Sequence, residues 1–102
     1  MDCINKNPKI SVIVVTYNSE TVIERCVSGL YEGLHSGFIE LIIVDNKSDD
    51  NFYLRQFENV NGIKLIYKDK NVGFSSGNNI GVTHANVKSD YILFLNPDVF
   101  IN

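Results

Sequence analysis

Four apolar runs recur along the chain, and each is bounded by proline, glycine, asparagine or aspartate residues that favour turns. The first run, ISVIVVT, consists mostly of β-branched residues, and this pattern predicts a strand that is buried on both faces. We therefore predict strands over Ile10–Thr16, Ile39–Val44, Ile63–Tyr67 and Tyr91–Leu95.

The segments between these strands contain the predicted helices. In the first segment apolar residues recur every three or four positions, which predicts a helix that is capped by Asn18-Ser19 and ends near Gly37. Its apolar face consists of Val22, Ile23, Cys26, Val27, Leu30 and Leu34. Two further helices are predicted, over residues 48–57 and from about Gly77 to Val87.

Strands and helices thus alternate in the order βαβαβαβ. Each connection between strands is long enough for a helical crossover, so we predict an α/β fold with a parallel sheet and helices on both of its faces. The length of 102 residues is suited to one core. We assign residues 1–9 to an N-terminal tail and residues 10–102 to the domain.

Charge and cysteine content argue against several classes of protein. The net charge of −3 and the lack of basic runs disfavour binding to nucleic acid or to an anionic membrane surface. The N-terminal segment is polar, unlike a signal peptide, and no apolar run is long enough to span a bilayer. The two cysteines, Cys3 and Cys26, do not suggest a disulfide framework, so we expect a reducing, cytoplasmic compartment.

Polar side chains follow the predicted strands at the points where they end. In a parallel α/β sheet these points share one edge, where ligands bind. The converging segments are Thr16-Tyr17-Asn18, Asp45-Asn46, Lys68 to Asn71 with Gly73, and Asn96-Pro97-Asp98. This convergence predicts a site for a polar ligand. Taken singly, each segment is also explained by an ordinary turn, and neither histidine has zinc ligands at suitable spacing.

Four motifs stand in order along the chain: VIVVTYN at 12–18, IIVDNKSDD at 42–50, NVGFSSGNNIG at 71–81 and YILFLNPDV at 91–99. Together they resemble the N-terminal half of family 2 glycosyltransferases. The resemblance implies a Rossmann-like GT-A nucleotide-sugar-binding half with strand order 3-2-1-4, in an inverting transferase. Two positions depart from the family pattern. Asn96 replaces the first aspartate of the Asp-x-Asp motif, and Asn78 stands where an arginine is common.

The resemblance also implies a donor, a cofactor and site residues. Asp98 would bind Mg²⁺ or Mn²⁺, which stabilises the negative charge on a departing diphosphate. Asp45 would accept a hydrogen bond from a pyrimidine base. The Asn-Pro-Asp variant is similar to a branch with many bacterial rhamnosyltransferases, which indicates a donor sugar linked to dTDP, with UDP as the alternative nucleotide. The residues implied in binding the nucleotide sugar are Thr16, Tyr17, Asn18, Glu20, Asp45, Asn46, Asn71, Gly73, Asn79 and Asn96.

Inversion requires a general base that deprotonates the acceptor. The family carries this carboxylate beyond the Asp-x-Asp motif, so we expect it after Asn102, together with the site for a glycan or lipid-linked acceptor. The chain would then be a fragment that transfers no sugar alone. The full enzyme would be bacterial, serve polysaccharide biosynthesis in the cytoplasm, and lie peripherally at the inner face of the membrane.

Two other functions compete with this interpretation. The first is a non-catalytic module that binds a nucleotide sugar without turnover. The second is a nucleotidyltransferase with a related fold. It is disfavoured because Thr16-Tyr17-Asn18-Ser19 follows the first predicted strand, where such enzymes usually carry a glycine-rich phosphate loop.

Overall fold

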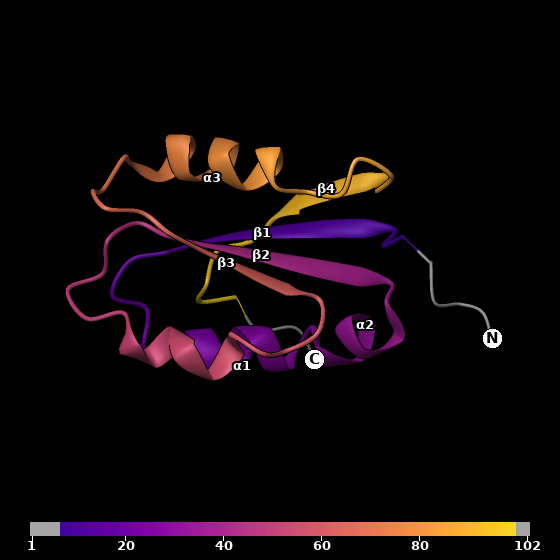
Figure 1. The fold of residues 1–102 in the computed structure, drawn as a ribbon. Helices are drawn as coiled ribbons and strands as arrows, with labels where there is room; N and C mark the ends of the chain where they lie inside the picture. The colour runs from indigo at the N-terminus through magenta and orange to yellow at the C-terminus, as the bar shows by residue number, and fades with distance from the viewer. Residues whose placement is uncertain (1–6, 100–102) are drawn as a thin grey trace.

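The computed structural model describes residues 7–99 and contains one four-stranded parallel sheet (Figure 1). Its strands are β1 (Ile10–Thr16), β2 (Ile39–Asp45), β3 (Ile63–Tyr67) and β4 (Tyr91–Phe94), in the spatial order β3-β2-β1-β4. All neighbouring pairs are parallel. The predicted α/β fold and the strand order 3-2-1-4 are therefore confirmed. Of the predicted tail, residues 1–6 lie outside the described range.

The central strands β1 and β2 build a core on each face of the sheet, because successive side chains of a strand point to opposite faces. On one face Val12, Val14, Leu41 and Ile43 pack in a cluster with residues of α1 (Ile23–Ser28), α2 (Tyr31–Ser36) and the 3₁₀ helix η2 (Phe52–Phe57). On the other face Ile13, Val15, Ile42 and Val44 pack beneath α3 (Phe74–Thr83). Figure 1 shows α3 on one side of the sheet and α1 and α2 on the other.

The single helix predicted between β1 and β2 is wrong, because the segment forms two short helices, α1 and α2. At the break the Leu30 amide donates to the carbonyl of Val27, three residues earlier, which tightens the backbone locally. The predicted end is confirmed. Gly37 has φ +83°, and its amide donates to the Leu34 carbonyl. The helix thus ends with a glycine in the left-handed backbone conformation, which is a common way for a helix to end. Cys26 is buried on the apolar face, as predicted.

The predicted helix cap at Asn18-Ser19 is also wrong. α1 begins after Val22, and no side chain caps its first turn. The oxygens that would form the cap accept other amides, since Oδ1 of Asn18 accepts the Asp49 amide and Oγ of Ser19 accepts the Tyr17 amide. These two residues therefore belong to a loop that is bonded to the segment after β2, and the helix starts only beyond that loop.

The other two predicted helices exist with different bounds. Residues 48–57 form a loop followed by η2, and the helix predicted from Gly77 to Val87 is α3, which begins and ends earlier. Small residues let α3 approach the sheet closely. A Cβ atom on Gly81 would lie only 2.4 Å from Cγ2 of Ile13. The glycine on this face therefore sets how near α3 lies to β1.

The strand β4 is an edge strand whose side chains are all exposed. Its sequence YILF is apolar, yet the exposed fraction reaches 64% at Tyr91. The reason is that α3 packs over β1 and β2 and leaves the faces of β4 uncovered by the described residues. Within residues 7–99, no helix is both long and apolar enough to cross a membrane.

Candidate functional site

A cleft of about 280 Å³ lies at the carboxyl edge of the sheet. Segments that follow all four strands contribute to its wall, which confirms the predicted convergence at this edge. The lining residues are Val15, Tyr17, Ser19, Asn46, Asn71, Phe74 and Pro97. Of the residues that the sequence implicated in binding, the cleft therefore brings together Tyr17, Asn46 and Asn71.

Thr16 and Asp45 end β1 and β2 and bond to each other behind the cleft wall. The Thr16 hydroxyl donates to Oδ1 of Asp45 at 2.8 Å. Asp45 is only 1% exposed, and it also accepts hydrogen bonds from the Ser48 hydroxyl at 2.6 Å and from the Ser48 amide at 3.0 Å. Neither Thr16 nor Asp45 lines the cleft. Direct contact between Asp45 and a base stays a prediction, whereas its internal hydrogen bonds support the loops in front of it.

Two loops in front of Asp45 are bonded to each other. We call residues 17–19 the β1 loop and residues 46–49 the β2 loop. Asn18 of the β1 loop has φ +50°, and its side-chain oxygen accepts the Asp49 amide at 2.8 Å while its Nδ2 donates to the Asp49 carboxylate at 3.2 Å. Lys47 of the β2 loop also has a positive φ, +68°. The Asn18 side chain therefore holds the loops together in this structure.

Asn46 joins the end of β2 to the segment that precedes α3. Its Oδ1 accepts the Val72 amide and its Nδ2 donates to the Gly73 carbonyl, both at 2.9 Å. Asn71 folds the same segment on itself, since its Oδ1 accepts the Gly73 amide at 2.8 Å. Asn46 and Asn71 thus line the cleft, and both bond to the backbone of Gly73.

Two aromatic rings line the cleft and remain accessible. Tyr17 is 49% exposed and Phe74 is 56% exposed. Partly exposed aromatic rings on a concave surface offer apolar area to a planar ligand. Tyr17 was predicted from its place at the end of the first strand, whereas Phe74 was not predicted. Its position directly after Asn71-Val72-Gly73, at the end of the strand-to-helix loop, was the signal that could have identified it.

The Asn96-Pro97-Asp98 segment contributes Pro97 to the cleft wall and leaves Asn96 and Asp98 exposed. The Val99 amide donates to the Asn96 carbonyl at 3.1 Å, so the segment is a turn. The Cys26 thiol contacts the same carbonyl at 4.0 Å. Burial raises the pKa of this thiol, and the negative charge of Asp98 raises it further, which indicates that Asp98 lies close to α1.

The residues of this turn supply only part of the ligand set of a divalent cation. Within residues 7–99, no group of three or more histidine, cysteine, aspartate and glutamate side chains could hold a metal ion. Asp98 and Asn96 supply a carboxylate and an amide oxygen, which are ligand types that Mg²⁺ and Mn²⁺ accept. This small donor set fits a cation that takes its remaining ligands from water and from the phosphates of a substrate.

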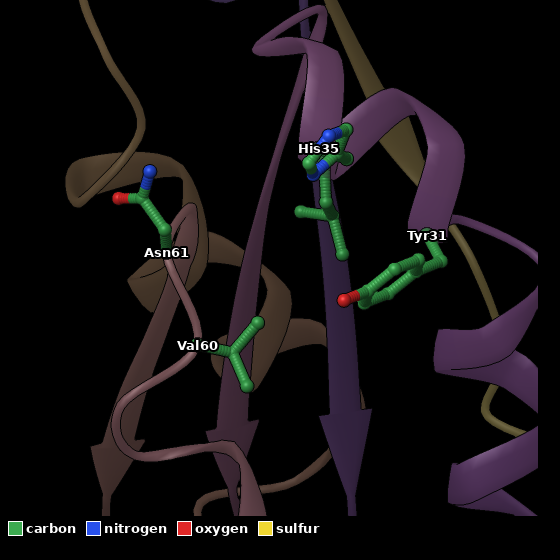
Figure 2. Close-up of a pocket in the computed structure, with 5 residues that line it drawn as sticks. Tyr31, His35, Val60 and Asn61 are labelled. Carbon is green, nitrogen blue, oxygen red and sulfur yellow. The ribbon is translucent and has the colours of Figure 1, made fainter.

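Glu20 and Asn79, which the sequence analysis also implicated, do not line the cleft. Both are exposed, Glu20 on the segment before α1 and Asn79 on α3. A second, smaller hollow of about 90 Å³ lies at the opposite edge, between α2 and the turn before β3 (Figure 2). Tyr31 and His35 stack there, with ring centroids 6.4 Å apart. The described strands begin at this edge and have their carboxyl ends at the cleft, so the cleft is the better candidate site.

A profile of glycosyl transferase family 2 matches residues 11–102. Over 95 residues the chain is 36% identical to a low-salt glycan biosynthesis hexosyltransferase of Haloferax volcanii, which covers 91% of this chain and 29% of that protein. Over 100 residues it is 32% identical to the poly(ribitol-phosphate) beta-glucosyltransferase of Bacillus spizizenii, covering 91% of this chain and 15% of that protein. The chain thus spans less than a third of the length of these relatives.

Solved structures share the fold. The structure of S. aureus TarS in complex with UDP-GlcNAc matches with a TM-score of 0.79 and 28% identity, over 92% of this chain and 28% of that chain. A mannosyltransferase from Pyrobaculum calidifontis, in complex with GDP-Man and Mn²⁺, matches with a TM-score of 0.75 over 94% of this chain and 29% of that chain. At 22% identity, the second match shows the fold alone.

Proposed function

The chain belongs to glycosyl transferase family 2, and we propose that its cleft binds the nucleotide part of a nucleotide-sugar donor. The observation that carries this proposal is the convergence of all four strand ends on one cleft that is lined by aromatic and amide side chains. A nucleoside diphosphate has a planar base, a polar ribose and an anionic end, so it needs both kinds of contact.

In this proposal the rings of Tyr17 and Phe74 provide apolar area for the base. Asn71 and Ser19 lie in the same wall and present hydrogen-bonding groups to the ribose or the base. The donor nucleotide is UDP or dTDP. The TarS complexes with UDP and UDP-GlcNAc support a uridine nucleotide. The Asn-Pro-Asp variant supports dTDP through its similarity to bacterial rhamnosyltransferases.

Asp98 and Asn96 are the residues that would hold a divalent cation beside the diphosphate. When bound, Mg²⁺ or Mn²⁺ acts as a Lewis acid that stabilises negative charge on the leaving group. Asn96 provides a neutral amide oxygen where the family motif has a carboxylate, so we expect weaker metal affinity than in a site with two carboxylates. The Mn²⁺ in the mannosyltransferase structure supports the use of a cation by this fold.

The complete reaction needs groups that the proposed donor site does not supply. Transfer with inversion requires a general base and a bound acceptor. We propose that both follow residue 102 in a longer enzyme, which transfers the sugar to a glycan or lipid-linked acceptor at the cytoplasmic face of the membrane. The relatives, which extend well beyond the matched region, support this division. The 102-residue chain alone should then transfer no sugar.

Calorimetric titration of the chain with UDP, dTDP and GDP, with and without MnCl₂, tests the proposal. We expect UDP or dTDP to bind more tightly than GDP. Phe74→Ala should weaken binding about 5- to 160-fold, because stacking of a base on an aromatic side chain contributes roughly 1–3 kcal/mol. Phe52→Ala is the matched control, since Phe52 is 71% exposed and does not line the cleft. Absence of binding by all three nucleotides, or equal losses in the two variants, would refute the proposal.

A further inference from the structure

We propose that Tyr53 is a positioning residue, whose hydroxyl group fixes the β1 loop and thereby the wall of the donor cleft. This inference rests on the proposed function. Tyr53 lies on η2, is partly buried, and does not line the cleft. Its hydroxyl oxygen accepts a hydrogen bond from the Ser19 amide at 3.1 Å and lies 3.0 Å from Oγ of Ser48. It therefore contacts both loops that stand in front of Asp45.

The positions of the hydroxyl protons follow from the carboxylate at the end of this network. The Ser48 hydroxyl group donates a hydrogen bond to the Asp45 carboxylate at 2.6 Å. Its only proton is used in this bond, so it cannot also donate to Tyr53. Tyr53 must then be the donor in its hydrogen bond with Ser48. The result is a one-directional chain, in which the Ser19 amide donates to Tyr53, Tyr53 donates to Ser48, and Ser48 donates to Asp45. Such chains polarise each member and strengthen its hydrogen bonds.

These hydrogen bonds fix the backbone of the β1 loop. Asn18 has φ +50°, in the left-handed region that asparagine adopts more readily than most residues other than glycine. Its amide donates to Ser48 at 2.8 Å, and the next amide, of Ser19, donates to Tyr53. Ser19 is only 7% exposed, so water cannot easily replace the tyrosine hydroxyl as its acceptor. Tyr17, at the start of the loop, and Ser19, at its end, both line the cleft.

The test is Tyr53→Phe, which removes one oxygen atom and keeps the ring in the core. We expect the variant to bind UDP or dTDP about 3- to 10-fold more weakly, as for the loss of one hydrogen bond between neutral groups. The ¹⁵N–¹H spectrum of the ligand-free protein should show shifted signals and faster hydrogen exchange for Asn18 and Ser19. A residue that only stabilised the fold would not change these two signals selectively. Tyr67→Phe is the matched control, because its hydroxyl group bonds at 3.2 Å to Glu58 outside the cleft.

A double-mutant cycle with Ser48→Ala adds an independent measurement. Because the hydroxyl groups of Tyr53 and Ser48 belong to one series of hydrogen bonds, the double variant should lose clearly less affinity than the two single losses combined. Unchanged Asn18 and Ser19 signals in Tyr53→Phe, or unchanged affinity while the wild type binds, would overturn the inference. Failure of the wild type to bind any of the nucleotides would instead overturn the proposed function. The amide signals would then still decide whether Tyr53 fixes the β1 loop.

Discussion

Replacing Asp45 by alanine should destabilise the fold as well as weaken nucleotide binding. The carboxylate is 1% exposed and accepts three hydrogen bonds from Thr16 and Ser48. A buried donor that loses its acceptor costs about 1–3 kcal/mol. The two hydroxyl groups can rotate toward new partners, whereas the Ser48 amide cannot. We therefore expect a loss of about 2–4 kcal/mol, out of a total near 5–15 kcal/mol for a domain of this size.

Urea unfolding followed by circular dichroism measures this loss, since the chain has no tryptophan to report by fluorescence. The midpoint should fall by about 1–3 M urea. Asp45→Asn should lose less stability, because its amide oxygen still accepts a hydrogen bond. Asp69→Ala, at an exposed position, serves as the control. If Asp45→Ala lost less than about 0.5 kcal/mol of stability yet bound UDP or dTDP much more weakly, the carboxylate would face the ligand, and the reasoning from its internal hydrogen bonds would be refuted.

Three further predictions concern the helix interface, the buried thiol and the metal. Gly81→Ala should cost about 1–3 kcal/mol in urea unfolding, because the new methyl group would meet Ile13, and an unchanged midpoint would contradict the close approach of α3. Cys26, in a Cys3→Ser background, should react with iodoacetamide more slowly than glutathione at pH 8. The raised pKa of Cys26 leaves little thiolate. Asp98→Asn should speed the reaction by removing a nearby negative charge, and equal rates with and without this substitution would argue against a position of Asp98 close to Cys26. Asp98→Ala should also spare binding of the nucleoside monophosphate and weaken that of the diphosphate only in the presence of Mn²⁺, as titration would show.

The parallel sheet could be predicted from the sequence, whereas its strand order was implied by the resemblance to family 2 glycosyltransferases. The apolar runs define the strands, and connections long enough for a helical crossover favour parallel neighbours. The same reasoning brought the four strand ends to one edge, where the cleft was found. Tyr17, Asn46 and Asn71 were correctly placed there because their position depends on where a strand ends rather than on details of packing.

The orientation of each side chain could not be predicted in this way. Asp45 and Asn46 are neighbours at the end of β2, yet one bonds behind the wall to Thr16 and the other bonds to the loop before α3. Sequence position carries no information about which partner a polar group finds across the fold. Tyr53 was missed for the same reason, because the acceptor it provides for Ser19 exists only once η2 packs beside the β1 loop.

The sequence by itself determined the order of elements, the parallel sheet and the edge at which the cleft lies, because these follow from local periodicity and chain connectivity. Tertiary structure decided where the first helix begins, since the side-chain oxygens of Asn18 and Ser19 accept amides of the loops and do not cap a helix. It also decided that β4 is exposed, because burial depends on what α3 covers and not on how apolar a strand is.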